Sequence, residues 1–284
     1  MKKYACASTT TLIASLAVLG TLGFGALTLD AQQRAEFSSK SLVGDYVFAE
    51  NGTVGANFGL AAIGRLTFDG NGGVTGWEIV RNSNRNVTTT CTGSYTVEAD
   101  GRGTLILTHT DATAGEEAPT TQSAYEFVVY GAGPVGERLS AIRSDNGTAV
   151  NVHLTKAQAR TSLDNLKGTY IFSESGTVAS ARETALAGLG LVNLDGMGGV
   201  SGWETIRYAG GSLTTSFTGT YSIDAAGVGT MNITHVLPGP VPDGEDPQRM
   251  TSSYTFLADV DGIRELHAVR TDAGIAVSST FTAR

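Results

Sequence analysis

The chain has 284 residues, a formal net charge of −8 at pH 7, 16% charged residues, 37 glycines, six prolines and two cysteines. An acidic chain without a basic patch interleaved with aromatics is a poor candidate for binding nucleic acid or an anionic membrane surface. Abundant glycine with little proline and modest charge favours many short β elements over a disordered chain.

Residues 1–31 are predicted to be a secretory signal peptide. Lys2 and Lys3 precede an apolar run from Leu12 to Leu27, and Ala31 is a small residue at which cleavage could occur. The alternative is a membrane anchor, but the run is shorter than the roughly 20 residues of a spanning helix. We therefore expect a secreted or periplasmic bacterial protein with no stable membrane insertion. Residues 32–41 are expected to be a flexible lead-in.

The rest of the chain contains one duplicated domain. The stretch Asp69–Glu78 returns as Asp195–Glu204, and each copy holds one of the two tryptophans, Trp77 and Trp203. Further matches keep the same order along the chain, and the period is far longer than that of solenoid repeats. The sequence thus predicts a first repeat at 42–157, a linker at 158–165 and a second repeat at 166–284.

Each repeat is predicted to be a run of short antiparallel strands. Gly, Asn and Asp cluster between the apolar segments, as in tight hairpin turns. About eight sequential strands per repeat favour an all-β fold of two tandem up-and-down β-barrels, with two β-sandwiches as the alternative. In the first repeat the strands are expected near 44–50, 58–68, 73–81, 86–98, 103–110, 122–130, 137–144 and 148–154, and the second repeat follows the same series from about 168 to 282.

Alternation along the predicted strands gives a candidate site, because successive side chains point to opposite faces of a sheet. The apolar face of each repeat also carries a His and an Arg near strand ends, and the Gly-Trp-Glu strand could turn either its Trp or its Glu inward. A buried carboxylate beside a His could move protons, and an Arg could hold a carboxylate. The competing interpretation is a structural ion pair, a His at a strand end and core tyrosines. The candidate ligand-binding residues are Trp77, Glu78, Tyr95, His109 and Arg143 in the first repeat and Trp203, Glu204, Tyr221, His235 and Arg270 in the second, with Tyr46 and Tyr125 expected in the same barrel mouth.

Metals and cofactors are not predicted. After loss of the N-terminal segment Cys91 is the one remaining cysteine, and its counterpart Phe217 indicates a core position. The four histidines do not form zinc-like clusters. The loop at Asp69 resembles a calcium loop, but Met197 replaces Asn71 in the second copy, so both loops are interpreted as hairpin turns.

The repeat resembles a family of bacterial exported barrel domains. The pattern that carries the resemblance stands at Leu42–Phe48, Gly64–Gly72, Thr92–Tyr95 and Gly103-Thr104, and again in the second copy, which departs from it at Leu191–Leu194. This family is similar to the allene oxide cyclase and dirigent type of eight-stranded barrel within the lipocalin-like group. The resemblance implies a barrel fold, and no catalytic residue is carried over.

Three functions follow as hypotheses. The first is non-enzymatic binding of a small, largely apolar ligand or of a surface partner. The second is an isomerase or cyclase that uses the duplicated Glu-His-Arg set. The third is a structural or adhesive envelope protein. A cavity with Glu78 and His109 within hydrogen-bonding reach would favour the enzyme, a cavity without them would favour carriage, and a packed interior would favour the structural role.

Overall fold

The computed structural model describes residues 36–55, 58–82, 85–115, 118–131, 136–157, 162–178, 184–239, 246–258 and 265–284. The predicted signal peptide at 1–31 lies outside these residues. The described helices are two 3-10 turns, and neither could cross a membrane.

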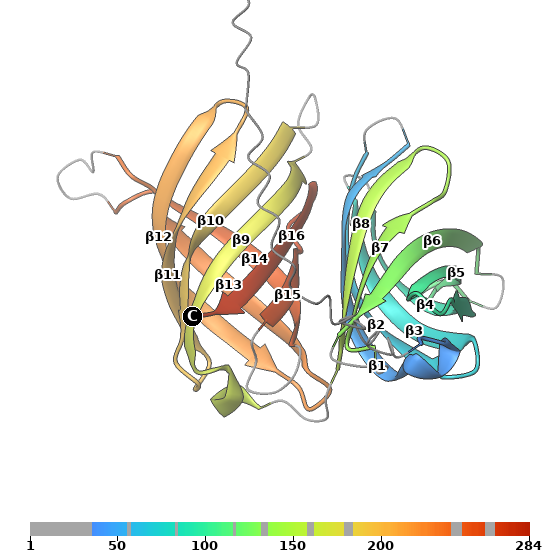
Figure 1. Cartoon of the computed structure of the whole chain (residues 1–284). Helices are drawn as coiled ribbons and strands as arrows, with labels where there is room; N and C mark the ends of the chain where they lie inside the picture. Colours follow the sequence, from blue (N-terminus) through green and yellow to red (C-terminus); the bar gives the residue numbers. More distant parts are fainter. Residues whose placement is uncertain are drawn as a thin grey trace, which may run out of the picture. The chain divides into compact units, whose positions relative to one another are not determined.

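The first repeat folds into a closed barrel in which each strand pairs with its sequence neighbours and β1 pairs with β8 (Figure 1). All the pairings are antiparallel, so this is the up-and-down barrel expected from the sequence. The strands are β1 (Val43–Val54), β2 (Phe58–Asp69), β3 (Gly73–Asn82), β4 (Arg85–Val97), β5 (Arg102–Asp111), β6 (Thr120–Tyr130), β7 (Arg138–Arg143) and β8 (Thr148–Lys156).

The second repeat closes in the same way, with β9 pairing with both β10 and β16 (Figure 1). Two closed barrels confirm the predicted fold class and exclude the sandwich alternative. The strands are β9 (Gly168–Val178), β10 (Thr184–Leu194), β11 (Gly199–Tyr208), β12 (Gly211–Ile223), β13 (Val228–Val236), β14 (Arg249–Ala258), β15 (Glu265–Arg270) and β16 (Ile275–Ala283).

Alternation of side chains builds one apolar core inside each barrel. Along β5 the buried residues are every second one, and they include Leu105 and Leu107. In the second barrel Met231 and Ile233 repeat this pattern on β13. Each interior is thus filled by the inward half of its strands, while the Thr- and Ser-rich half faces outward.

The duplicated loop at Asp69 is a hairpin turn that the Asp69 side chain stabilises through hydrogen bonds. The Asp69 carboxylate accepts hydrogen bonds from the backbone N–H groups of Asn71 (2.7 Å) and Gly73 (2.9 Å), which lowers its pKa. Gly70 and Gly72 have φ values of 78° and 102°, which residues with a Cβ rarely adopt. Asp195 makes the same two contacts in the second copy, so the repeat motif is turn chemistry.

One end of the first barrel, here called the capped end, is closed by the segment that precedes β1. The turn η1 (Ser39–Ser41) lies against Tyr95, whose hydroxyl donates to the carbonyls of Ser39 and Leu42, both at 3.0 Å. Phe37 packs against the barrel core. In the described part of the 32–41 lead-in, an aromatic side chain and hydrogen bonds thus hold the segment against the barrel.

The linker ends in a second 3-10 turn, η2 (Leu163–Leu166), at the entrance to the second barrel. Leu166 is fully buried in that barrel's core, and its carbonyl accepts a hydrogen bond from the Tyr170 hydroxyl (3.1 Å). The second barrel thus begins with the same device of a short turn held by a strand tyrosine.

The outer faces of the two barrels are in contact. The Asn51 amide donates to the Ser175 carbonyl (2.8 Å) and the Ser278 hydroxyl (2.7 Å), and the Arg65 guanidinium donates to the Ala226 carbonyl. Between these polar contacts lies an apolar cluster in which every member has 0% exposure: Val47, Ala61 and Ile63 from β1 and β2, and Leu257 and Val269 from β14 and β15.

Candidate functional site

Ionisable side chains gather inside the first barrel toward the end opposite η1, here called its mouth. At this end β3 stops at Asn82, β5 at Asp111 and β7 at Arg143. Because the strands alternate in direction, residues late in β1, β3, β5 and β7 and early in β4 and β6 approach one another here. The inward-facing members are Glu50, Glu78, Thr89, Cys91, His109, Tyr125 and Arg143.

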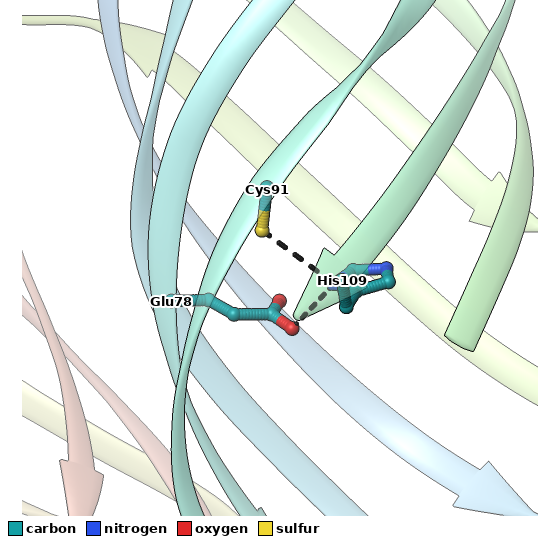
Figure 2. Close-up of side chains that lie close together, drawn as sticks. All are labelled: Glu78, Cys91 and His109. Atoms are coloured by element: carbon teal, nitrogen blue, oxygen red, sulfur yellow. Dashed lines mark hydrogen bonds and ion pairs between the residues drawn. The ribbon is translucent and has the colours of Figure 1, made fainter. Parts of the chain in front are cut away.

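Glu78 and His109 form the centre of this group. Nδ1 of His109 lies 2.7 Å from Oε1 of Glu78, and the same carboxylate oxygen accepts a hydrogen bond from the Thr89 hydroxyl (2.9 Å). The Cys91 Sγ atom lies 3.5 Å from Nδ1 of His109. Figure 2 shows the three side chains of Glu78, Cys91 and His109 pointing toward one another from adjacent strands. All three are at least nine-tenths buried.

A second carboxylate, Glu50, lies in the same interior. Its Oε1 atom accepts a hydrogen bond from the Tyr125 hydroxyl (2.8 Å). Burial, followed by the nearby charge of Glu78, raises the pKa of Glu50 to about 7. Arg143 sits at the rim, where its Nε atom donates to Asp145 (2.6 Å). Glu50 therefore changes its charge near neutral pH.

The pKa values of the His and Cys follow from the same surroundings. Burial lowers the pKa of His109, but the hydrogen bond and charge of Glu78 outweigh it, so the net shift is upward. Burial and the charge of Glu78 raise the pKa of the Cys91 thiol to about 12. Glu78 thus favours the protonated form of His109, and Cys91 is an inert thiol unless a cation displaces its proton.

A cavity of about 160 Å³ opens beside this group. Its charged side is formed by Glu50, Glu78, His109 and Arg143, and Nε2 of His109 is buried there without a hydrogen-bond partner among the described residues. Its remaining walls are Leu60, Val80, Asn82, Val87, Thr89, Asp111, Pro119, Thr121 and Ser123. The cavity therefore mixes charged and polar side chains with a few apolar ones, Leu60, Val80, Val87 and Pro119.

The second barrel keeps the same charged residues in a different arrangement. Oε1 of Glu204 lies 3.2 Å from Nδ1 of His235, but that nitrogen is also 3.1 Å from the Thr215 hydroxyl, and neither Glu204 oxygen has hydrogen-bonding geometry to a described residue. Burial, followed by the charge of Glu174, raises the pKa of Glu204 to about 8. Burial lowers the pKa of His235 to about 4. This pair is therefore uncharged at neutral pH.

Arg270 completes the second network from the rim. Its NH2 atom donates to the Ser252 hydroxyl (2.6 Å), which lies 3.0 Å from Nε2 of His235, and its Nε atom donates to Asp272 (2.6 Å). The nitrogen that is unpartnered in the first barrel is thus satisfied in the second. At the position of Cys91 stands Phe217, whose ring centroid lies 5.6 Å from that of His235. A larger ring and an inward-turned arginine therefore lie beside the histidine of the second barrel.

The structure brings together some of the residues predicted from the sequence and not others. Glu78, His109 and Arg143 share the mouth of the first barrel, and Glu204, His235 and Arg270 share the interior of the second. Trp77 and Trp203 point outward, which answers the orientation question left open by the sequence. Trp77 packs against the apolar cluster between the barrels, and Trp203 is 45% exposed.

The tyrosines divide between the two ends of the barrel. Tyr125 lies in the candidate site, as expected. Tyr95 lies at the capped end with Tyr46, whose hydroxyl donates to the Gly136 carbonyl. Tyr221 accepts a hydrogen bond from the N–H of Gly196 in the duplicated turn (2.9 Å). The position of a residue along its strand decides whether it lies at the capped end or at the mouth. Because neighbouring strands run in opposite directions, the start of one strand lies at the same end as the finish of the next.

Sequence reasoning missed the second carboxylate of each barrel, Glu50 and Glu174. The signal was present, because residues 46, 48 and 50 alternate on one strand face and the first two are buried aromatics. Glu174 follows Tyr170 and Phe172 in the same pattern. A carboxylate that continues an aromatic inward face should have been placed inside the barrel.

The first barrel also holds a possible set of metal ligands that spacing along the chain did not reveal. One ligand atom each from Glu78, Cys91 and His109 lies within 4.8 Å of the others. Carboxylate, thiolate and imidazole are ligands that zinc accepts at about 2.0–2.3 Å. The second barrel lacks the thiol, since Phe217 replaces it. The prediction of no metal site stays untested.

No protein-family model and no curated protein matches the chain. Among solved structures it is similar to isotype 1 transferrin binding protein B from serogroup B Neisseria meningitidis, with 9% identity, a TM-score of 0.35 and coverage of 88% of this chain and 77% of that one. A mutant of the vaccine antigen transferrin binding protein B from Haemophilus parasuis Hp5 gives 9% identity, a TM-score of 0.29 and coverage of 84% and 75%. Neither score is high enough to say what this chain binds. The finer resemblance to allene oxide cyclases stays a prediction.

Proposed function

We propose that this chain is an exported binding protein whose first barrel takes a small cationic ligand, while the corresponding residues of its second barrel have a structural role. The observation that carries this proposal is the cavity at the mouth of the first barrel, which is lined by Glu50, Glu78 and His109. In the second barrel Arg270 and His235 both bond to the Ser252 hydroxyl, so the histidine nitrogen that lacks a partner among the described residues of the first barrel is occupied.

The charge of the cavity favours a cation. Its lining holds three carboxylates, Glu50, Glu78 and Asp111, against Arg143 and His109. Arg143 is paired with Asp145, and His109 offsets Glu78, so the charge of a bound cation would rest mainly on Glu50. A cation placed between Glu50 and Glu78 would relieve the repulsion that raises the pKa of Glu50. This lining departs from the largely apolar ligand expected from the sequence.

The size of the cavity suits a small ligand. A volume of about 160 Å³ is close to that of an engineered apolar cavity that binds benzene. Two kinds of cation fit. A small alkylammonium would rest its charge on Glu50 and Glu78 and its carbon skeleton on Leu60, Val80 and Val87. A divalent transition metal would instead be held by Glu78, Cys91 and His109.

Calorimetric titration of the purified chain with cyclopentylamine and, separately, with zinc chloride tests the proposal. Glu50→Gln is expected to weaken the amine about tenfold or more, because a charge-assisted hydrogen bond is lost, and to leave zinc binding unchanged. Cys91→Ser is expected to weaken zinc and leave the amine unchanged. Cyclopentanecarboxylate is the matched anion and should not bind. Absence of binding by both cations, or equal binding of the carboxylate, would contradict the proposal.

Proton-transfer catalysis is the second candidate function. A cavity that holds Glu78 and His109 within 2.7 Å of each other is the arrangement under which the sequence reasoning favoured an isomerase or cyclase. The second barrel keeps a Glu–His pair whose histidine contacts the Thr215 and Ser252 hydroxyls, so the pair also has a structural use, and we therefore place binding first. Incubating any bound ligand with the chain and with Glu78→Gln, followed by mass analysis, separates the two. Conversion by the unmodified chain alone would favour the enzyme.

A further inference from the structure

We propose that copies of this chain associate head to tail through two exposed apolar faces, each of which repeats one side of the contact between the chain's own barrels. The first, here called the β9–β11 face, consists of Ile171, Leu189, Leu191 and Trp203 on the outside of the second barrel. The second, here called the β6–β7 face, consists of Val128 and Ile142 on the outside of the first barrel.

The contact between the two barrels of one chain shows which two surfaces are complementary to each other. On one side the first barrel contributes Val47, Ile63 and Trp77 from β1, β2 and β3. On the other side the second barrel contributes Leu257 and Val269 from β14 and β15. Val47, Ile63, Leu257 and Val269 have 0% exposure, so the two surfaces exclude water from each other.

The second barrel carries its own version of the first side, and it is uncovered. The strand registers place Ile171, Leu189 and Trp203 where Val47, Ile63 and Trp77 stand in the first barrel. Ile171 pairs with Leu191, and Leu191 pairs with Trp203, so the apolar side chains run across three adjacent strands. Ile171 is 45% exposed, Leu189 57% and Trp203 45%.

The first barrel carries its own version of the second side, and it is uncovered as well. Val128 stands at the position of Leu257, and Ile142 at that of Val269. They are 47% and 54% exposed. Both line a hollow of about 470 Å³ on the outside of the barrel, whose floor includes Phe127 and Ala141. The hollow corresponds in position to the surface of the second barrel, around Leu257 and Val269, that contacts the first barrel.

The partner that fits these two faces is a second copy of the chain. Each is the duplicate of a surface that already has a partner within the chain, and the two partners fit each other. Repeating the contact between copies would join the β9–β11 face of one to the β6–β7 face of the next. Such a heterologous contact, unlike a two-fold one, adds copies in a row or closes into a ring.

The contact between copies is expected to be weaker than the one within the chain. Arg102 and Glu126 stand where Val228 and Thr255 lie in the second barrel, so the β6–β7 face has a more charged surround. The two barrels of one chain are also tethered, whereas separate copies must lose their freedom of motion to associate. Association should therefore depend on concentration.

Sedimentation velocity of the full chain over a range of concentrations tests this assembly. Species larger than the monomer are expected to grow with concentration. Leu189→Glu blocks the β9–β11 face, and Ile142→Glu blocks the β6–β7 face. Each variant alone should be monomeric over this concentration range. The association constant should fall about tenfold or more, because a carboxylate must be desolvated on association. A mixture of the two variants should form a one-to-one pair and stop there, since each retains the face that the other has lost.

Met197→Glu is the matched control, because Met197 is 81% exposed at the duplicated turn and belongs to neither face. It should assemble like the unmodified chain. Trp203→Arg and Val128→Lys replace the first two variants if either fails to fold by circular dichroism. A chain that stays monomeric at every concentration would overturn the proposal. So would variants that still assemble singly, or a mixture of folded variants that does not pair.

Discussion

At the scale of single residues, the two barrels differ in the surroundings of their buried Glu–His pairs. Cys91 and Phe217 occupy the same position beside the histidine of each barrel. The smaller residue accompanies a Glu–His pair at 2.7 Å beside a cavity, and the larger accompanies a pair that burial keeps uncharged. Because repulsion and burial act on every carboxylate in these interiors, their effects should be measurable as pH dependence.

The unmodified chain should lose stability as the pH rises toward 8, and replacing Glu204 by Gln should abolish that loss. The folded-state pKa of about 8 is above the ordinary value of 4.5, so the folded chain binds more protons than the unfolded chain between these values. The contribution of Glu204 to the free energy of unfolding is therefore fully present below about pH 4.5 and is lost as the pH rises through 8.

Urea unfolding of the chain and of Glu204→Gln at pH 5 and pH 9 measures this effect. The unmodified chain should lose a few kcal/mol more than the variant between the two values, at about 1.4 kcal/mol per unit of pKa shift. Glu98→Gln, an exposed carboxylate, is the control. Equal pH dependence of the chain and the Glu204 variant would show that Glu204 is not a buried acid.

Glu50 should make amine binding by the first barrel pH-dependent. Because its pKa is about 7, a cation either binds the ionised form of Glu50 or displaces the proton from the neutral form. Affinity for cyclopentylamine should rise between pH 6 and pH 8, by at most about tenfold per pH unit below the pKa. Calorimetry in buffers of different ionisation enthalpy would detect the released proton. In Glu50→Gln the rise should disappear, and its persistence there would point to another titrating group.

At the scale of the elements, turns and caps fix each barrel's capped end. The aspartate turn requires glycine at positive φ, and η1 is held by the Tyr95 hydroxyl. These contacts are local in sequence or depend on a single strand residue. Their loss should lower stability without touching the mouth of the barrel.

Gly72→Ala should destabilise the first barrel by about 1–3 kcal/mol, because a side chain at its φ of 102° is strained. The added Cβ would also lie 3.2 Å from the Tyr95 carbonyl. Gly115→Ala is the matched control, since nothing lies within 4 Å of its Cβ position and its φ is not in the positive region. Urea unfolding compares the two. Equal stabilities would mean that the turn tolerates a side chain.

Tyr95→Phe should loosen η1 while leaving the barrel folded. The hydroxyl donates to two backbone carbonyls, so its removal should cost about 1–2 kcal/mol. Hydrogen exchange should then speed up at Ser41 and Leu42, whose N–H groups close the turn. Tyr130→Phe, at an exposed tyrosine, serves as the comparison. Unchanged exchange at η1 would show that packing alone holds the segment.

At the scale of the whole molecule, duplication produced two domains that are no longer equivalent. One surface of each barrel is used to join them, and the copy of each surface is left over. The same residue position is therefore buried in one barrel and exposed in the other, so a pair of matched substitutions can separate fold from interface.

Ile63→Ala should destabilise the contact between the barrels by about 2–5 kcal/mol, because Ile63 is fully buried there. Its counterpart Leu189→Ala should change stability by no more than about 0.5 kcal/mol in dilute solution, since that side chain is 57% exposed. Calorimetric unfolding should show the two barrels melting separately in the first variant only. Similar costs for both would contradict the interface described here.

The sequence by itself determined the fold, because alternation, turn glycines and the internal repeat are local signals. Strand positions and barrel closure followed from them, and β1 ended at Val54 instead of near residue 50. The sequence also named Glu78, His109 and Arg143 correctly as neighbours at one mouth. Only the tertiary structure decided that Glu50 joins them, that Tyr95 does not, and that Trp77 faces outward. The physical reason is that depth inside a closed barrel depends on strand tilt and register summed around the sheet, whereas alternation along one strand records only its two faces.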